Sequence, residues 1–447
     1  MRRIIKSSIL LLFSLLITYS CKNSTSSENP EFFTDPNFEI LIRETLNKPS
    51  GDITKSDMLT ITYLEGWSKG ITSIDGIEYC ENLEVINLWD NQISDFSALV
   101  DLTKLTGLSL SKNQISDISV LVDLPNLTYL NLSKNQITDI GVLTDLLNLC
   151  VLNLSYNQIN DINSLSNLIN LTNLYLSRNQ ISDINVLADL TNLTALYLSG
   201  NQLNIISAIA DLMNLEELSL SNNPLTEINA LASLTNLTHL NLQYVQISDI
   251  SALGGLTKLE NLDISMNQIA DISALKDLIN LYELTLWDNH LRDITILANL
   301  TNIRNLYISN NNISDISSLS GLTNLIRLIL RNTQISDISS LTGLQNINYL
   351  DIAKNQIADI NALTNLTNLL ELIINDNQIS EISALAGLTN LKYLHLSVNK
   401  ISDIQPLIQN QGINDGDTVN LNSNPLSEIT INTLIPQLKA RGVEVNY

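Results

Sequence analysis

The stretch LTGLSLSKNQISDISVLVDLPN at residues 105–126 decides the fold, because the chain repeats it at once as LTYLNLSKNQITDIGVLTDLLN at residues 127–148. The two stretches carry leucine, isoleucine and asparagine at matching places, 22 residues apart. We number each unit from its central asparagine, called n, so that Asn113 and Asn135 both occupy n. The unit is then LxxLxLxxNxIxDIxxLxxLxN, with apolar residues at n−5, n−3, n+2, n+8 and n+11.

This unit recurs along most of the chain. Asparagine occupies n at residues 91, 113, 135, 157, 179, 201, 223, 267, 289, 311, 355, 377 and 399. Val245 and Thr333 replace it in two further units, and divergent units flank the series near Lys69 and Asn424. One unit cannot bury its apolar face alone, so the units must stack and share a continuous core of leucine and isoleucine.

The pattern within the unit predicts three local structures. The LxL segment alternates with a period of two, which is typical of a short β-strand. The asparagine after it can hydrogen-bond backbone groups where the chain turns, so successive asparagines are expected to form a stacked ladder. The segment DIxxLxxL favours a brief 3₁₀ turn on the opposite side, with the acidic residue at n+4 capping its free N–H groups.

With these motifs the sequence is identified as a leucine-rich repeat, and the 22-residue form with IxDIxxL resembles the bacterial internalin type. The resemblance implies an α/β solenoid, a horseshoe with a parallel β-sheet on the concave side and short 3₁₀ turns and loops on the convex side. The stretch DPNFEILIRETLNK at residues 35–48 is similar to the internalin cap. We expect a helical N-terminal cap at 31–60, about 17 repeats at 61–425, and a C-terminal cap at 426–447 made of a helix and a strand.

The N-terminus resembles an export signal. Arg2, Arg3 and Lys6 precede an apolar run that ends before Cys21, which predicts a signal peptide at residues 1–20. A small residue followed by cysteine resembles a bacterial lipobox and implies lipidation of Cys21, with residues 21–30 as a polar tether. The expected location is therefore the bacterial cell envelope, lipid-anchored and exposed at the surface. A plain secretory peptide is the alternative.

Composition and charge exclude several classes of function. The net charge is −23, with 46 acidic and 23 basic residues, whereas nucleic-acid binding depends on clustered Lys and Arg. The chain has three His, three Cys and 15 Gly, without a nucleophile–base arrangement or a phosphate-binding loop. We therefore expect no enzyme, no cofactor and no metal site, and interpret the acidic residues at n+4 as caps rather than calcium ligands.

Large amphipathic rings gather at the positions expected to face the concave side. Strand alternation directs n−6, n−4, n−2 and n−1 away from the core. All three Trp lie at n−2 and nine of the thirteen Tyr lie at these four positions, but no Phe does. Tyr and Trp provide contact area together with a polar group, which is typical of a recognition surface. The candidate ligand-binding residues are Trp67, Trp89, Tyr129, Tyr156, Tyr175, Tyr197, His239, Tyr244, Trp287, Tyr307, Arg327, Arg331, Tyr349, Tyr393 and His395.

These observations favour a non-catalytic surface protein that binds a protein ligand along its concave face, such as a surface protein of a host or of a neighbouring cell. Internalins use that face for host receptors, but this sequence has neither the Ig-like module that follows their repeats nor a C-terminal sortase signal. An invasion role is therefore not implied. Two alternatives stay open: a glycan or cell-wall binding module, since aromatic rings also stack on sugars, and an envelope scaffold.

Overall fold

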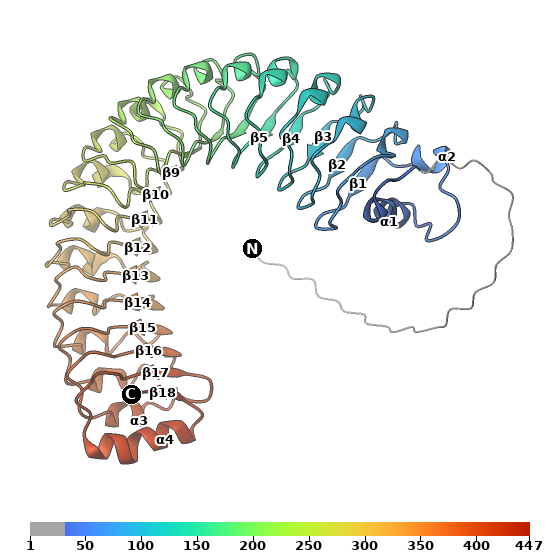
Figure 1. The fold of residues 1–447 in the computed structure, drawn as a ribbon. Helices are drawn as coiled ribbons and strands as arrows, with labels where there is room; N and C mark the ends of the chain where they lie inside the picture. Colours follow the sequence, from blue (N-terminus) through green and yellow to red (C-terminus); the bar gives the residue numbers. More distant parts are fainter. Residues whose placement is uncertain (1–31) are drawn as a thin grey trace, which may run out of the picture.

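One parallel sheet lines the inner side of an open arc in the computed structural model, which describes residues 32–447 (Figure 1). The predicted solenoid with a concave parallel sheet is thus confirmed. The predicted signal peptide and Cys21 lie outside the described residues. No helix within residues 32–447 has the length and apolarity needed to cross a membrane.

The sheet has 18 strands, which follow one another in sequence order. They are β1 (Tyr63–Glu65), β2 (Val85–Asn87), β3 (Gly107–Ser109), β4 (Tyr129–Asn131), β5 (Val151–Asn153), β6 (Asn173–Tyr175), β7 (Ala195–Tyr197), β8 (Glu217–Ser219), β9 (His239–Asn241), β10 (Asn261–Asp263), β11 (Glu283–Thr285), β12 (Asn305–Tyr307), β13 (Arg327–Ile329), β14 (Tyr349–Asp351), β15 (Glu371–Ile373), β16 (Tyr393–His395), β17 (Thr418–Asn420) and β18 (Glu444–Asn446). Each strand pairs in parallel with the next, and partners from β1 to β16 are 22 residues apart, as in Tyr63 and Val85. Equivalent residues of successive units therefore stand side by side.

Short 3₁₀ turns cover the outer side of the arc (Figure 1). They are η1 (Ile77–Tyr79), η2 (Ser97–Leu99), η3 (Ser119–Asp123), η4 (Gly141–Asp145), η5 (Asn163–Leu165), η6 (Asn185–Leu187), η7 (Ser207–Ile209), η8 (Asn229–Ser233), η9 (Ser251–Leu253), η10 (Ser273–Asp277), η11 (Thr295–Asn299), η12 (Ser317–Gly321), η13 (Ser339–Leu341), η14 (Asn361–Leu363) and η15 (Ser383–Leu385). The carboxylate at n+4 accepts the first free N–H of the turn, as Asp315 Oδ1 does from Ser317 N at 2.8 Å. The predicted caps are confirmed.

Asparagines at n join each unit to the one before it. Asn289 Nδ2 donates to the carbonyls of Leu286 and Ile264 at 3.1 and 3.0 Å, and its Oδ1 accepts from Ile269 N at 3.0 Å. The predicted ladder is confirmed, and the leucine and isoleucine columns lie in one continuous core. Where the asparagine is missing, Thr333 Oγ1 donates to Leu330 O at 2.8 Å.

Helical caps close both ends of the core. At the N-terminal end, α1 (Pro36–Thr45) begins at Asp35, whose Oδ1 accepts from Asn37 N and Phe38 N, and α2 (Lys55–Met58) follows. At the C-terminal end lie α3 (Gln405–Gln409), the π turn η16 (Thr430–Leu434) and α4 (Ile435–Ala440). The predicted C-terminal helix widens into η16 just before Pro436, whose ring would clash with a normal α-helical turn and which lacks an N–H.

Candidate ligand-binding face

Three-residue strands set the direction of the side chains on the concave face. The first and third residues of each strand, at n−6 and n−4, point to the inside of the arc, and the middle residue at n−5 points into the core. In β1, Tyr63 is 51% exposed and Leu64 is fully buried. In β12, Tyr307 is half-buried on the concave side and Leu306 is fully buried.

The residue at n−1 does not follow this alternation. The strand has ended before it, and its backbone is left-handed, with φ of +59° at Tyr156 and +53° at Tyr244. Both rings are about half exposed, but they stand in the turn that follows the strand. The expectation that strand alternation directs n−1 is therefore wrong, because a left-handed residue breaks the extended geometry on which alternation depends.

Two tryptophans form the first cluster, at the N-terminal end of the face. The ring centroids of Trp67 and Trp89 are 6.2 Å apart, and the planes are inclined by 43°. Lys112 Nζ lies 5.7 Å from the centroid of the Trp89 ring and 2.6 Å from Asp90 Oδ1. The rings are 55% and 39% exposed, so both can contact a ligand.

The tyrosines of the middle repeats separate into a pair and two single rings. Tyr175 and Tyr197 stack with centroids 4.9 Å apart, and the Tyr197 hydroxyl donates to Glu217 Oε2. Burial and this carboxylate raise the pKa of Tyr197. Tyr129 lies at n−6 of its unit, and Tyr156 lies in the turn. The structure therefore does not combine the four tyrosines into one patch.

A third cluster covers β11 to β14. The guanidinium of Arg327 stacks on the ring of Tyr349, 4.1 Å from its centroid. Burial raises the pKa values of Tyr307 and Tyr349, so both phenols stay protonated at neutral pH. Trp287 is half-buried at n−2, directly after β11. His239 is the first residue of β9, and it stands farther along the same face.

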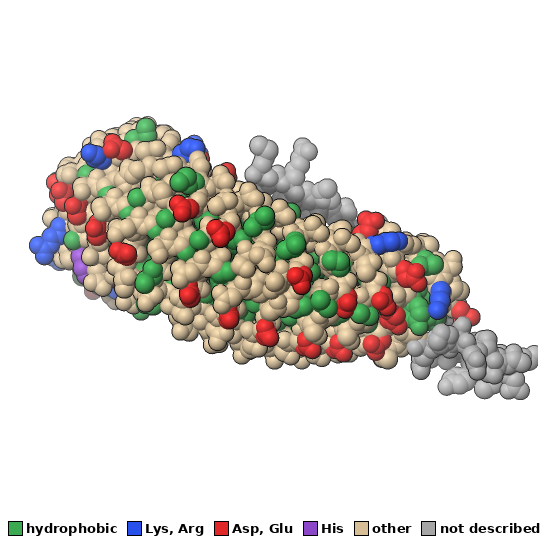
Figure 2. All heavy atoms as spheres, turned by 90° about the horizontal axis from the view of Figure 1, so that it is seen from above, with side chains coloured by type: hydrophobic (Ala, Val, Ile, Leu, Met, Phe, Trp, Pro, Cys, Tyr) green, Lys and Arg blue, Asp and Glu red, His purple; other side chains and the backbone are tan. Residues whose placement is uncertain are grey.

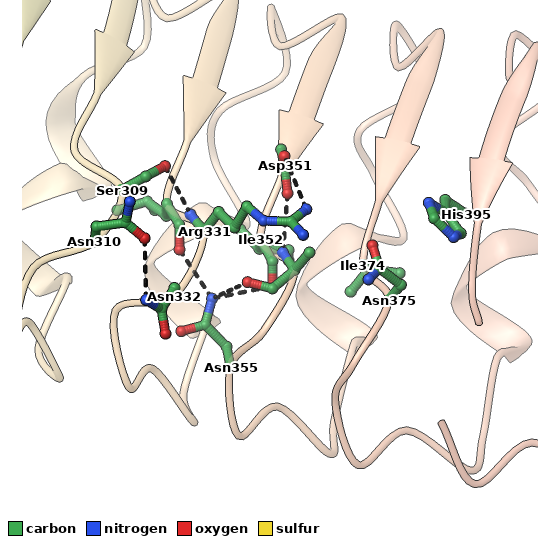
Figure 3. Close-up of polar contacts among 12 residues, drawn as sticks. Ser309, Asn310, Arg331, Asn332, Asp351, Ile352, Asn355, Ile374, Asn375 and His395 are labelled. Atoms are coloured by element: carbon green, nitrogen blue, oxygen red, sulfur yellow. Dashed lines mark hydrogen bonds and ion pairs between the residues drawn. The ribbon is translucent and has the colours of Figure 1, made fainter. Parts of the chain in front are cut away.

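Arg331, just after β13, and Asp351, in β14, form the charged part of the same face (Figure 3). Arg331 Nη1 lies 3.9 Å from Asp351 Oδ2, and Asp351 Oδ1 accepts from Ala353 N at 3.0 Å. Burial raises the pKa of Asp351, whereas burial and the Arg331 charge lower the pKa of His395. His395 in turn contacts Tyr393 edge to face at 6.3 Å between centroids. The Arg331 side chain is 37% exposed and keeps most of its donors available.

Sequence reasoning missed several polar residues of this face. Ser109, Ser111 and Asn131 border the two tryptophans, and Asn375 Oδ1 is buried without a hydrogen-bond partner among the described residues. Small polar residues at n−4 and n−2 recur in most units, so the sequence carries no signal that separates these from the others. Their positions could be placed on the concave face, but not their hydrogen bonding.

The outer side of the arc offers a different chemistry. Figure 2 shows acidic side chains along this side, with basic ones mostly toward the ends of the view. Hydrogen bonds from backbone N–H groups lower the pKa values of Asp315 and Asp337. No group of three or more His, Cys, Asp or Glu within residues 32–447 could hold a metal ion. The carboxylates of Asp315 and Asp337 accept from the N–H groups of Ser317 and Ser339 and so serve as caps.

Several solved structures are similar to this chain. An internalin from Listeria monocytogenes is 30% identical, with 89% of this chain and 97% of that chain covered and a TM-score of 0.48. A leucine-rich repeat protein from Leptospira interrogans is 22% identical over 88% and 97% of the chains, with a TM-score of 0.71. The plant peptide hormone receptor RGFR1, solved in complex with RGF2, is 20% identical over 88% and 71%, with a TM-score of 0.64. No curated protein matches the sequence.

The family comparison identifies the repeats themselves. The family described as Leucine Rich repeats (2 copies) matches residues 103–145, 147–189, 191–233, 235–277, 323–365 and 367–409. These segments make up more than half of the chain. The asparagine ladder and the buried leucine columns lie within them, as Asn267 Nδ2 shows by donating to Leu242 O at 2.8 Å. The chain therefore belongs to the leucine-rich repeat family.

Proposed function

We propose that this protein is a non-catalytic, internalin-like surface protein that binds a protein partner along its concave face. The observation that carries the proposal is the exposure of large amphipathic rings on the inner wall of the arc while the core holds aliphatic side chains. Rings of this kind supply much contact area at low entropic cost, as hot spots of protein interfaces do. The plant receptor among the structural neighbours is solved with a bound ligand, RGF2, so this fold can serve such a function.

We place the partner contact on the third cluster, over β11 to β14. Trp287, Tyr307 and Tyr349 supply apolar area, and the Arg327 guanidinium lies over the Tyr349 ring, 4.1 Å from its centroid. Arg331 supplies donors for a carboxylate of the partner, because Asp351 lies beyond hydrogen-bond distance from it. Rings and a positioned guanidinium in one area are typical of an interface centre.

The experiment is a triple substitution of Trp287, Tyr307 and Arg331 by alanine. Full-length protein and variant are used as bait against envelope and host-cell extracts, and the recovered partner is then titrated with both. We expect the variant to lose binding at least about a hundredfold while its urea unfolding midpoint stays the same. Arg292→Ala is the matched control, because Arg292 is exposed outside the sheet. Unchanged binding by the triple variant, or equal loss in the control, contradicts the proposal and favours the envelope scaffold.

We also propose that the protein reaches the cell surface as a lipoprotein, anchored through Cys21 after removal of residues 1–20. Basic residues, an apolar run and a small residue before the cysteine support this. Mass spectrometry of the N-terminal peptide tests it. A diacylated Cys21 is expected, whereas an unmodified N-terminus at another residue indicates a plain secretory peptide.

A further inference from the structure

A hollow of about 430 Å³ opens on the concave face over β1 to β4, far from the third cluster. Its lining consists of Trp67, Trp89, Asn87, Ser109, Ser111 and Asn131. These residues alternate between n−2 and n−4 of successive units, so the hollow runs diagonally across four strands. At about 4.8 Å between strands, this is a path of about 14 Å. Ligand sites in proteins begin at about 300 Å³.

The apolar part of the hollow is a pair of exposed indole rings. Trp67 and Trp89 are inclined to each other by 43°, so their faces present two platforms rather than one closed stack. The unit that follows Trp89 carries the small residues Gly107, Ser109 and Ser111, and Lys112 of the same unit lies over one face of the Trp89 ring. The two tryptophans are 55% and 39% exposed, so both rings can still contact a ligand.

The polar part of the hollow has hydrogen-bonding capacity that the protein leaves unused. Within residues 32–447, neither indole N–H donates a hydrogen bond, and the hydroxyls of Ser109 and Ser111 make none. Ser199 Oγ and Ser219 Oγ, at the same two repeat positions, are paired with each other at 2.6 Å. Hydroxyl and amide side chains each both donate and accept, so this lining suits a ligand that carries hydroxyl groups.

The lining carries no charge. Glu65 pairs with Asn87 across β1 and β2 at the edge of the hollow, and Asp90 and Lys112 form an ion pair of 2.6 Å at its rim. Lys112 Nζ also lies over the Trp89 ring and covers one face of it. An anionic ligand would meet the Glu65 carboxylate beside Asn87, whereas a neutral ligand is not repelled there.

We propose that this hollow is a binding site for a neutral oligosaccharide. A pyranose ring has an apolar C–H face that stacks on an indole and a rim of hydroxyls that donate and accept, which matches both parts of the lining. A proline-rich peptide would also stack on the rings, but it offers only carbonyl acceptors and would leave the oxygen atoms of Ser109 and Ser111 without donors. The site does not depend on the protein partner proposed above.

The test uses tryptophan fluorescence of the purified protein. The chain has three Trp, so Trp287→Phe leaves Trp67 and Trp89 as the emitters. Cellohexaose, mannohexaose and N-acetylchitohexaose are the neutral probes, and a hexagalacturonate and a hexaproline are the charged and peptide probes. We expect at least one neutral probe to give a saturable change with Kd below about 1 mM, and neither of the others to do so.

Calorimetric titration of variants then places the binding. Trp89→Ala is expected to weaken it at least about tenfold, and Ser109→Ala with Ser111→Ala about three- to tenfold, with unchanged circular dichroism and unfolding midpoint. Trp287→Ala is the matched control at the same repeat position, and it should leave saccharide binding unchanged even if it abolishes partner binding. Saturation by none of the neutral probes at 10 mM, binding that survives Trp89→Ala, or a preference for hexaproline or hexagalacturonate overturns the proposal.

Discussion

Replacement of one ladder asparagine, Asn289→Ala, tests how the stack of repeats is held together. Asn289 is 4% exposed, and its side chain makes three hydrogen bonds with the backbone. The ladder carbonyls are shared, because Ile264 O also accepts from Asn267 Nδ2 and Leu286 O also accepts from Asn311 Nδ2. The substitution therefore leaves both carbonyls with one partner and removes the side-chain acceptor of Ile269 N–H.

The expected loss of stability follows from which backbone groups keep a hydrogen-bond partner and which do not. A buried N–H left unpaired costs about 1–3 kcal/mol, and each lost hydrogen bond to a carbonyl that keeps a partner costs about 0.5–1 kcal/mol. The sum is about 2–5 kcal/mol. Thr333→Val is the matched control, because Thr333 Oγ1 donates to Leu330 O, which also accepts from Asn355 Nδ2. It orphans no backbone group and should cost about 1 kcal/mol.

Urea unfolding followed by circular dichroism measures both effects. Solenoids can unfold in parts, so hydrogen exchange of the Ile269 amide is measured as well. We expect faster exchange of this amide in Asn289→Ala and no change there in Thr333→Val. If the two variants lose equal stability, or if the Ile269 amide stays protected, the ladder does not hold the units together through these bonds.

Three further predictions concern titratable groups. Burial raises the pKa of Cys80 to about 12, so a thiol reagent should modify exposed Cys150 within minutes and Cys80 only after unfolding, as peptide mapping will show. Burial raises the pKa of Asp351 in the folded protein, so its negative charge opposes folding at pH 7. Asp351→Asn should therefore raise the urea midpoint at pH 7. The difference in midpoint between variant and wild type should disappear below about pH 4, where Asp351 is protonated in both the folded and the unfolded state. Backbone hydrogen bonds lower the pKa values of capping carboxylates such as Asp315 and Asp337, so the caps stabilise the fold above about pH 4 and lose this effect as the pH falls further. Urea midpoints that stay level from pH 5 to pH 3 would contradict a stabilising role of these caps.

Much of the fold could be predicted because each column of the repeat has one physical task. The apolar columns determine the core, the asparagine at n determines the ladder, and the acid at n+4 determines the caps. A second asparagine, at n+13, also hydrogen-bonds the backbone of the preceding unit, because Asn302 Nδ2 donates to Ile279 O at 2.8 Å. The turn at n−1 could not be predicted, since Lys, Asp, Tyr and Asn all occupy it and none of them identifies a left-handed residue.

The sequence predicts which residues lie on the concave face, but not which of their side chains contact one another. The period places Arg331 and Asp351 on neighbouring units, and contacts between residues 20 apart recur, as in Tyr197 with Glu217. Whether a side chain such as that of Arg331 reaches its neighbour depends on its rotamer and on the size of the adjacent residue, here Ala353 of the next unit. The same limit explains why the hollow at Trp89 could not be found from the ring positions alone.

Site-directed labelling tests most directly that the concave face is the binding face. Ser309 lies at n−2 beside Arg331, and Ser317 begins η12 on the outer side of the same unit. Each is replaced by cysteine in a protein whose Cys21 and Cys150 are serine, and a bulky polyethylene glycol is attached. The label at residue 309 is predicted to abolish capture of the protein partner, and the label at residue 317 to leave it intact. Capture that survives the inner label and is lost with the outer one would contradict the account.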